Sequence, residues 1–227
     1  MNWYKKANKY LEQLRDETKK YKNPKDFAKD YEVLYHGGSE DIIGEKLSNG
    51  GRVVGPVTQE NVGKGSDYGG IFFTPERNFA DTFKNHAPGG KGKVHTFLVK
   101  KKGLFDESNP QHARMLKNFI GKNYINIDGD TDQFSQQMYD FIFPLLDDGK
   151  RHMDWATMDP NILAAVGFEG AKVIENYNAY GNGKHLYSTV LFTGGENSPH
   201  WKVEEGQTPE QIYQQMQAKP QLNQPSR

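Results

Sequence analysis

Hydrophobic positions in this chain follow two different spacings, so the sequence predicts both helices and strands. Near the N-terminus five apolar side chains recur at helical spacing: Trp3, Ala7, Tyr10, Leu11 and Leu14. An amphipathic helix over about residues 2–21 follows from this pattern. Asn23 and Pro24 end it, and residues 24–29 add at most a turn.

Short apolar runs bounded by glycine, proline or polar residues predict the strands. They cover about residues 32–36, 70–73, 94–99, 171–174, 187–192 and 201–203. Helical periodicity and capping residues predict the helices between and after them, over about residues 75–86, 110–120, 131–147, 160–167 and 209–218. Thr208 and Gln211 form the capping box of the last helix, and Gly121 is expected to close the helix that starts at Pro110.

This order of elements predicts an α+β protein with one main domain. We expect an N-terminal amphipathic helix over 1–30, a central domain over 31–205, and a C-terminal helix with a disordered tail over 206–227. Residues 49–69 are rich in glycine and have no hydrophobic period, so they predict a long mobile loop.

Composition excludes several classes of protein. The chain has 29 basic and 29 acidic residues, so no overall positive charge favours nucleic acid. Residues 1–30 are locally basic, and a solvated helix is a better interpretation than a nucleic-acid arm. The absence of cysteine excludes disulfides and thiol catalysis. We find neither a signal-peptide pattern nor an apolar run of the ~18 residues that a membrane span requires, and therefore expect an intracellular protein.

Metal and hydrolase motifs are also missing from the sequence. The seven histidines form no His-x-His or His-Glu-x-x-His pair. Asp128-Gly-Asp-Thr-Asp132 begins like a calcium loop, but Tyr139 occupies the position of the twelfth-residue acid. A Gly-x-Ser-x-Gly elbow is absent, and Gly63-Lys-Gly-Ser66 lacks the frame of a phosphate-binding loop. We therefore expect no metal.

Two strand ends carry the residues with candidate chemistry. The first apolar run ends at His36-Gly-Gly38, and a glycine after the histidine lets a planar ligand approach the backbone. The second apolar run leads into Thr74, a natural N-cap, with Pro75 expected at the first helical position. Loops that follow strands are common places for binding sites.

These two stretches together resemble a known family. Val33-Leu-Tyr-His-Gly37, followed by Gly70-Ile-Phe-Phe-Thr74 and a helix that reaches Phe83, resembles the NAD-binding core of ADP-ribosyltransferases. The more similar branch is that of diphtheria toxin and poly(ADP-ribose) polymerases, in the single-domain form found in phage polyvalent proteins. The resemblance covers roughly residues 31–195, with firm motifs only at 33–38 and 70–83.

The resemblance implies a fold and a function. The fold has two small packed β-sheets with flanking helices and an NAD cleft, over which the loop at 49–69 closes. The function is transfer of one ADP-ribose from NAD to a macromolecule, with a protein as the expected acceptor and nicotinamide as the leaving group. Such a protein acts inside a cell, delivered by a phage or as a toxin-like effector.

The family motif also assigns roles to individual residues. By this resemblance His36 binds a ribose hydroxyl, and the backbone of Gly37 binds the nicotinamide carboxamide. Phe72 and Phe83 are eleven positions apart, as the two family tyrosines are, and are expected to stack on the nicotinamide ring. Phenylalanine keeps the stacking face of tyrosine and lacks its hydroxyl group.

The family glutamate has no direct counterpart in this sequence. Ser188 stands at its position at the start of the last core strand, and serine supplies no negative charge beside an oxocarbenium ion. Glu175, at the end of the preceding strand, is the best substitute. Glu169 and Glu196 sit beside glycine in expected turns and are poorer candidates.

Two other functions remain open at this stage. One is an NAD- or ADP-ribose-binding module with weak or no turnover, which the serine at position 188 favours. The other is a structural or interaction protein in which His36, Phe72 and Phe83 are ordinary core residues. The arginine-specific branch of the family is disfavoured because its Arg, Ser-Thr-Ser and Glu-x-Glu motifs are absent.

Overall fold

The computed structural model describes most of the chain outside a few loops and the two termini. The described residues are 3–38, 71–84, 92–123, 137, 140–141, 143–145, 149–153, 160–176, 181, 184–192 and 200–218. The expected glycine-rich loop at 49–69, the calcium-like segment at 128–132 and the expected disordered tail lie outside these residues.

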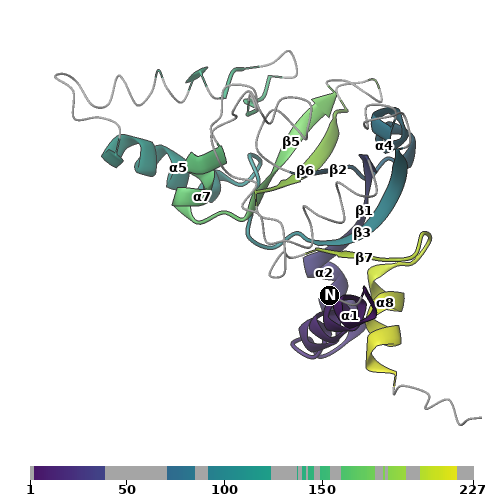
Figure 1. Ribbon diagram of the computed structural model, residues 1–227. Helices are drawn as coiled ribbons and strands as arrows, with labels where there is room; N and C mark the ends of the chain where they lie inside the picture. Colours follow the sequence, from purple (N-terminus) through teal and green to yellow (C-terminus); the bar gives the residue numbers. More distant parts are fainter. Residues whose placement is uncertain are drawn as a thin grey trace, which may run out of the picture.

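Two small β-sheets form the centre of the protein (Figure 1). The first sheet is antiparallel, in the order β1 (Tyr31–Gly38), β3 (Lys93–Lys100) and β7 (His200–Lys202). The second has the order β2 (Ile71–Phe73), β6 (Leu186–Leu191), β5 (Gly170–Asn176) and β4 (Leu104–Phe105), and only the β4–β5 pair is parallel. The expected α+β class with two small sheets is therefore confirmed.

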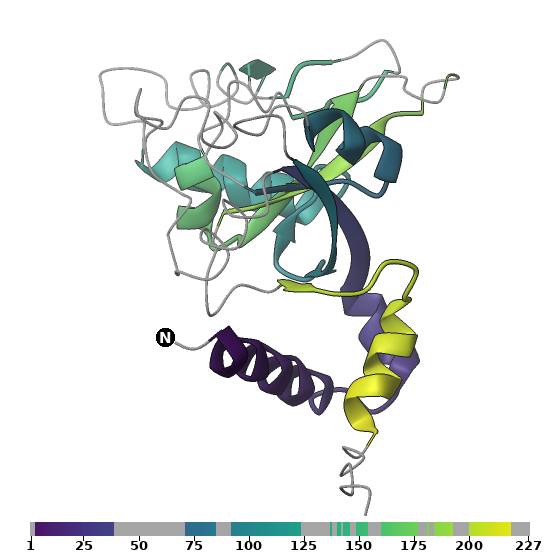
Figure 2. The ribbon, with the colours of Figure 1, turned by 45° about the vertical axis from the view of Figure 1, so that its right-hand side comes forward.

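Helices flank both sheets. Their bounds are α1 Trp3–Thr18, α2 Pro24–Asp30, α4 Arg77–Lys84, α5 Pro110–Asn123, α7 Pro160–Val166 and α8 Pro209–Gln217. In Figure 1, α5 and α7 lie beside β5 and β6, α4 lies next to β1 and β3, and α1, α2 and α8 gather beyond β7. Figure 2 shows α8 beside α2, with the N-terminal end of α1 pointing away from both.

Backbone hydrogen bonds join the two sheets near the end of β1. The amide of Tyr35 donates to the carbonyl of Thr74, and the amide of Thr74 donates to the carbonyl of Tyr35, both at 2.8 Å. An apolar cluster continues this joint between the sheets, with Leu34, Ile71, Phe73, Phe97, Val99, Leu104 and Leu191 buried in it. Because successive strand residues point to opposite faces, the alternate residues of β2 and β6 face away from this cluster.

The opposite face of the second sheet packs against α5 and α7. Ala171, Val173 and Val190 contribute to that core from the strands, and Leu116, Ile120 and Leu163 contribute from the helices. A third apolar cluster attaches the terminal helices to the outer face of the first sheet, through Leu14, Phe27, Tyr31, Leu98, Ile212, Tyr213 and Met216. The first sheet is thus covered on both faces, by the second sheet and by helices from both ends of the chain.

One sequence prediction about helix ends is confirmed, and another is corrected. The Thr208–Gln211 capping box is formed at α8, with both reciprocal hydrogen bonds present. Residues 24–29 form a regular helix instead of a turn, because the Asn23 side chain caps the amide of Asp26 and Pro24 occupies its first turn.

The start of α4 differs from the prediction. The helix begins at Arg77, so Pro75 is not its first residue and Thr74 is not its N-cap. Thr74 instead pairs with Tyr35 through its backbone, while its hydroxyl accepts a hydrogen bond from the Glu76 amide at 3.2 Å. Pairing with another strand requires extended backbone at Thr74, and this long-range contact delays the helix.

Further expectations are wrong in detail. Gly121 lies inside α5, which continues to Asn123. Leu104 and Phe105 form a strand of the second sheet where no strand was predicted, because Gly103, at φ +88°, turns the chain. Leu11 is 49% exposed and so lies off the packed face of α1. The helix predicted over about 131–147 does not extend that far, because residues 143–145 are not helical and Leu145 pairs with Arg151 in an isolated β-bridge.

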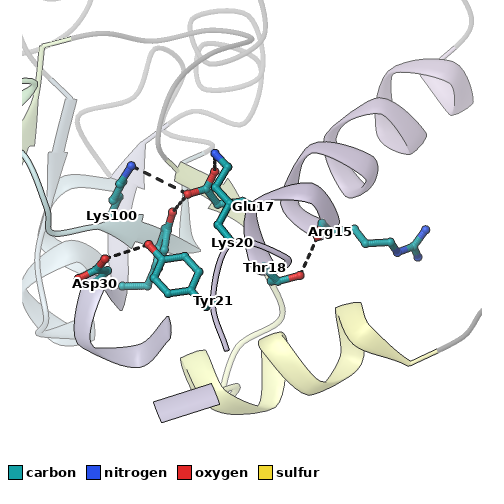
Figure 3. Close-up of polar contacts among 8 residues, drawn as sticks. Arg15, Glu17, Thr18, Lys20, Tyr21, Asp30 and Lys100 are labelled. Atoms are coloured by element: carbon teal, nitrogen blue, oxygen red, sulfur yellow. Dashed lines mark hydrogen bonds and ion pairs between the residues drawn. The ribbon is translucent and has the colours of Figure 1, made fainter. Parts of the chain in front are cut away.

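A polar network holds α1 against the first sheet (Figure 3). The Glu17 carboxylate on α1 accepts a hydrogen bond from the Tyr31 hydroxyl at 2.7 Å, pairs with Lys20, and lies 3.9 Å from Lys100 Nζ. Burial acts to raise the pKa of Glu17, but hydrogen bonds from Lys20 and Tyr31 outweigh it and hold the pKa below its usual value. The network therefore links α1, β1 and β3 around one ionised carboxylate.

We expect Tyr31→Phe to destabilise the protein by about 1–3 kcal/mol, because it removes the buried hydroxyl that satisfies Glu17. Tyr213→Phe is the matched control: it removes a 3.0 Å hydrogen bond from a tyrosine hydroxyl to a neutral group, the backbone carbonyl of Tyr21. The control should lose only about 0.5–1.5 kcal/mol. Urea unfolding monitored by tryptophan fluorescence measures both free energies. Equal losses in the two variants would contradict a special role for Glu17.

Candidate functional site

His36 lies near the end of β1, where the two sheets meet. Its Nδ1 atom is 2.6 Å from the carbonyl oxygen of Phe72 in β2. A carbonyl oxygen only accepts hydrogen bonds, so Nδ1 carries the proton, and Nε2 is the acceptor nitrogen in the neutral ring. The ring also packs against Phe73, at a centroid distance of 5.8 Å. Two consecutive residues of β2 thus fix the tautomer and the position of this histidine.

Close packing against α4 requires a glycine at position 37, and the sequence did not indicate this contact. A Cβ atom at this position would lie 1.9 Å from the carbonyl oxygen of Ala80 in α4. Such a contact is far inside van der Waals distance, so any larger residue would push α4 away from β1. Among the described residues, the space beside Gly37 that a Cβ atom would need is therefore taken by the α4 backbone.

The two expected aromatic residues have different environments. Phe72 is half-buried in β2, opposite Val190 of β6, and packs against the core beneath α5 and α7. Phe83 is 41% exposed at the end of α4, with its ring edge-to-face with Phe79 at 5.1 Å. The interpretation of Phe83 as an ordinary core residue is therefore wrong.

Ser188 and Glu175 are hydrogen-bonded neighbours in the structure. β5 and β6 are adjacent, Val173 pairs with Ser188, and the register shifts between Ile174 and Asn176, at Glu175. Burial raises the pKa of Glu175, and a hydrogen bond from Ser188 opposes that shift. The sequence treated the two residues as alternatives, with Glu175 having to reach across from another strand; the structure brings them together.

A contiguous strip of strands connects these residues. His36 contacts β2 through the Phe72 carbonyl, Phe72 pairs with Val190, and Ser188 lies two residues from Val190 on the same face of β6. Glu175 follows on the next strand. The backbone of four adjacent strands therefore connects these residues, with the His36 ring against Phe73 on one face of the second sheet and the Phe72 and Ser188 side chains on the opposite face.

The other acidic candidates do not join this strip. Glu169 is exposed before β5, and its backbone hydrogen bonds run to Gly103 and Phe192. Glu196 and the loop expected to cover the dinucleotide lie outside the described residues. Glu175 is thus the acid that the described structure associates with Ser188.

His200 is a buried residue of this region that sequence analysis missed. It lies in β7 with its ring 5.4 Å from Phe73 and 5.8 Å from Phe97. Burial, with a smaller effect from the charge of His36, lowers its pKa to about 3. A histidine before a short apolar run gives no sequence signal of burial, because the packing partners come from β2 and β3.

A second missed feature is a buried carboxylate–histidine pair. His152 Nδ1 lies 2.6 Å from Glu107 Oε1, and both side chains are 5% exposed. The two residues are 45 positions apart, so no local motif connects them.

Searches for metal and membrane features gave no candidate in the described part of the chain. No group of three or more histidine, aspartate or glutamate side chains there has a metal-binding arrangement. None of the helices described is both long and apolar enough to cross a bilayer.

Comparisons with known proteins found no relative of this chain. Neither a family model, nor a curated protein, nor a solved structure matches it.

The low pKa of His200 predicts a loss of stability in acid. The folded state keeps this ring neutral, whereas the unfolded chain takes up a proton below its pKa of 6.5. Stability is therefore fully present above pH 6.5 and falls as the pH decreases toward 3, by at most about 1.4 kcal/mol per pH unit. His200→Phe, which keeps an aromatic ring of similar size, should reduce the loss between about pH 6.5 and 5 by roughly 2 kcal/mol. Urea unfolding at the two pH values measures this difference, and parallel losses in both proteins would contradict it.

Proposed function

We propose that this protein is a mono-ADP-ribosyltransferase that moves ADP-ribose from NAD to a macromolecular acceptor, which we expect to be a protein. The sequence resemblance of 33–38 and 70–83 motivates the proposal, and the strip from His36 to Glu175 supports it. NAD is the substrate that donates the group, so no resident cofactor is needed.

The hydrogen-bonded Glu175–Ser188 pair is the single observation that carries the proposal. Departure of nicotinamide leaves positive charge on the ribose, and a nearby carboxylate stabilises that charge. The serine at the family position lacks a charge of its own, but it binds a carboxylate on the adjacent strand. The pair thereby supplies the acid that the sequence lacks at position 188.

The remaining residues of the strip have roles in binding. His36, held with its proton on Nδ1, offers Nε2 as acceptor for a ribose hydroxyl. Phe72 and Phe83 provide ring faces for nicotinamide. Gly37 admits the close approach of α4, which carries Phe83, and so contributes to this site by packing in addition to any backbone hydrogen bond.

The chemistry conserves atoms and charge. The bond between ribose C1′ and the nicotinamide nitrogen breaks, and its electron pair leaves with nicotinamide. The nucleophilic atom of the acceptor forms a bond to C1′, and its proton passes to solvent. Glu175 must be ionised for its electrostatic role. Because burial raises the pKa of Glu175, we expect activity to fall when the pH decreases far enough to protonate this carboxylate.

A binding module without turnover is the second candidate, and one observation favours it. Ser188 is only 2% exposed and Glu175 is half-buried, so the described residues leave only part of the carboxylate open to a ligand. A carboxylate that cannot reach the ribose leaves NAD bound and unreacted. Binding of NAD with no release of nicotinamide would support this second function.

Glu175→Gln tests the proposed catalysis directly. A unit charge at ~4 Å in an effective dielectric near 20 contributes roughly 4 kcal/mol, so its loss should slow nicotinamide release about a thousandfold. NAD affinity, measured by calorimetry, should remain nearly unchanged, because the amide keeps the size of the carboxyl group. Glu169→Gln is the matched control, since Glu169 is exposed just before the same strand. Wild-type turnover that survives Glu175→Gln would exclude Glu175 as the catalytic acid.

Phe83→Ala tests the binding mode. Loss of one stacked aromatic ring costs about 1–3 kcal/mol, so NAD binding should weaken roughly tenfold. The fold should survive, because Phe83 is exposed. Leu11→Ala on α1 is the control for removal of an exposed apolar side chain, and it should not change NAD affinity. Unchanged affinity in Phe83→Ala would show that the ring does not contact nicotinamide.

A further inference from the structure

The buried pair of Glu107 and His152 has no role in the proposed reaction. The Glu107 carboxylate accepts from His152 Nδ1 at 2.6 Å through one oxygen and from the backbone amide of Met153 through the other. Both side chains are almost completely buried. Through these two hydrogen bonds, the Glu107 carboxylate attaches residues 152–153 to the turn after β4.

Glu107 lies in the turn that directly follows β4. β4 runs parallel to β5, with Phe105 beside Ala171, and Lys172 Nζ of β5 lies 3.7 Å from Asp106 at the start of this turn. The residue after Lys172 on β5 is Val173, which pairs with Ser188 of β6. The turn that carries Glu107 is therefore next to the strand that pairs with Ser188.

His152 connects this point to the start of β6. Its ring is edge-to-face with the ring of His185, at a centroid distance of 5.0 Å. His185 immediately precedes β6, and its own ring lies 6.4 Å from Tyr187. The Glu107–His152 pair therefore contacts the end of β4 and the start of β6, on either side of the β5 segment that contains the Glu175 irregularity.

A gain in stability alone does not explain a buried pair such as Glu107 and His152. A buried carboxylate and imidazole lose their hydration, and well-packed apolar residues often replace a buried polar pair with no loss of stability. What a hydrogen-bonded pair adds is a fixed geometry, because its distances and angles are narrowly defined. In this structure the fixed geometry lies next to the strand ends that carry Glu175 and Ser188.

We propose that Glu107 and His152 are positioning residues that fix the start of β6, through His185, so that Ser188 holds Glu175 at the bulge. The expected effect on turnover depends on the proposed function. The positioning itself concerns the environment of Glu175 and can be measured without NAD.

The test compares three variants of the full-length chain. Glu107→Ala removes both hydrogen bonds of the carboxylate. Glu107→Gln is the conservative variant: its amide oxygen accepts from Met153, and its NH₂ group donates to His152 once that ring adopts the other tautomer. His185→Ala removes only the half-buried ring between His152 and β6, and so provides a variant that folds if Glu107→Ala does not.

The first readout is the titration of the Glu175 carboxyl, followed by ¹³C NMR with selectively labelled glutamate. We expect its midpoint to fall toward the ordinary glutamate value in Glu107→Ala and His185→Ala, because the released carboxyl becomes hydrated. The midpoint should stay at the wild-type value in Glu107→Gln. An unchanged Glu175 titration in folded Glu107→Ala or His185→Ala would overturn the proposal.

The second readout is nicotinamide release at saturating NAD. Turnover should fall roughly 10- to 100-fold in Glu107→Ala, as expected when a catalytic group is displaced by about 1 Å, with NAD affinity unchanged. Glu107→Gln should restore most of it. If the wild type releases no nicotinamide, the proposed function fails, while the NMR titration still decides the positioning role. A lower melting temperature with wild-type turnover and titration would assign the pair a structural role only.

Discussion

The pairing of Tyr35 with Thr74 is the contact on which the rest of the candidate site depends. Two reciprocal backbone hydrogen bonds join the end of the first sheet to the edge of the second. One residue further along β1, His36 donates to the carbonyl of Phe72, so the same joint orients the histidine. The apolar cluster around Phe73 and Phe97 keeps water away from these bonds, which makes them costly to break. The start of α4 is delayed by the same pairing, and α4 in turn lies against Gly37.

Buried polar groups are concentrated around this joint and at the strand ends of the second sheet. His200 is kept neutral between two phenylalanine rings, and Glu175 is held by Ser188 with its pKa raised by burial. The Glu107–His152 pair lies near the same strand ends. Buried titratable groups are costly, and proteins retain them where geometry or charge serves a purpose. Helix α1 makes a separate contribution, since Glu17 joins it to the first sheet away from this region.

The sequence pattern predicted most elements well and their ends less well. The capping box at Thr208 and the strands of β5 and β6 are present as predicted, because local capping and apolar runs depend on near neighbours in the chain. Thr74 was assigned to a helix cap on equally local grounds, and that assignment is wrong because a distant strand occupies its backbone. For the site, the family resemblance had singled out His36, Phe72, Phe83, Glu175 and Ser188 as candidates, each by its own position in the sequence. It gave no sign of His200, Glu107 or His152, whose partners are far away in the sequence.

The sequence by itself therefore determined the α+β class, the order of elements and the residues with candidate chemistry. The class and the order of elements follow from periodicity and composition, and the candidate residues follow from short motifs and the family resemblance that they carry, which are all local properties of the chain. Only the tertiary structure decided that Ser188 and Glu175 are partners, that α4 packs against Gly37, and that Phe83 is exposed while Phe72 is half-buried. Each of these depends on strand register or on the approach of one backbone to another. Strand register and the distance between two backbones are set by the packing of the whole core, so they cannot be predicted from any single stretch of sequence.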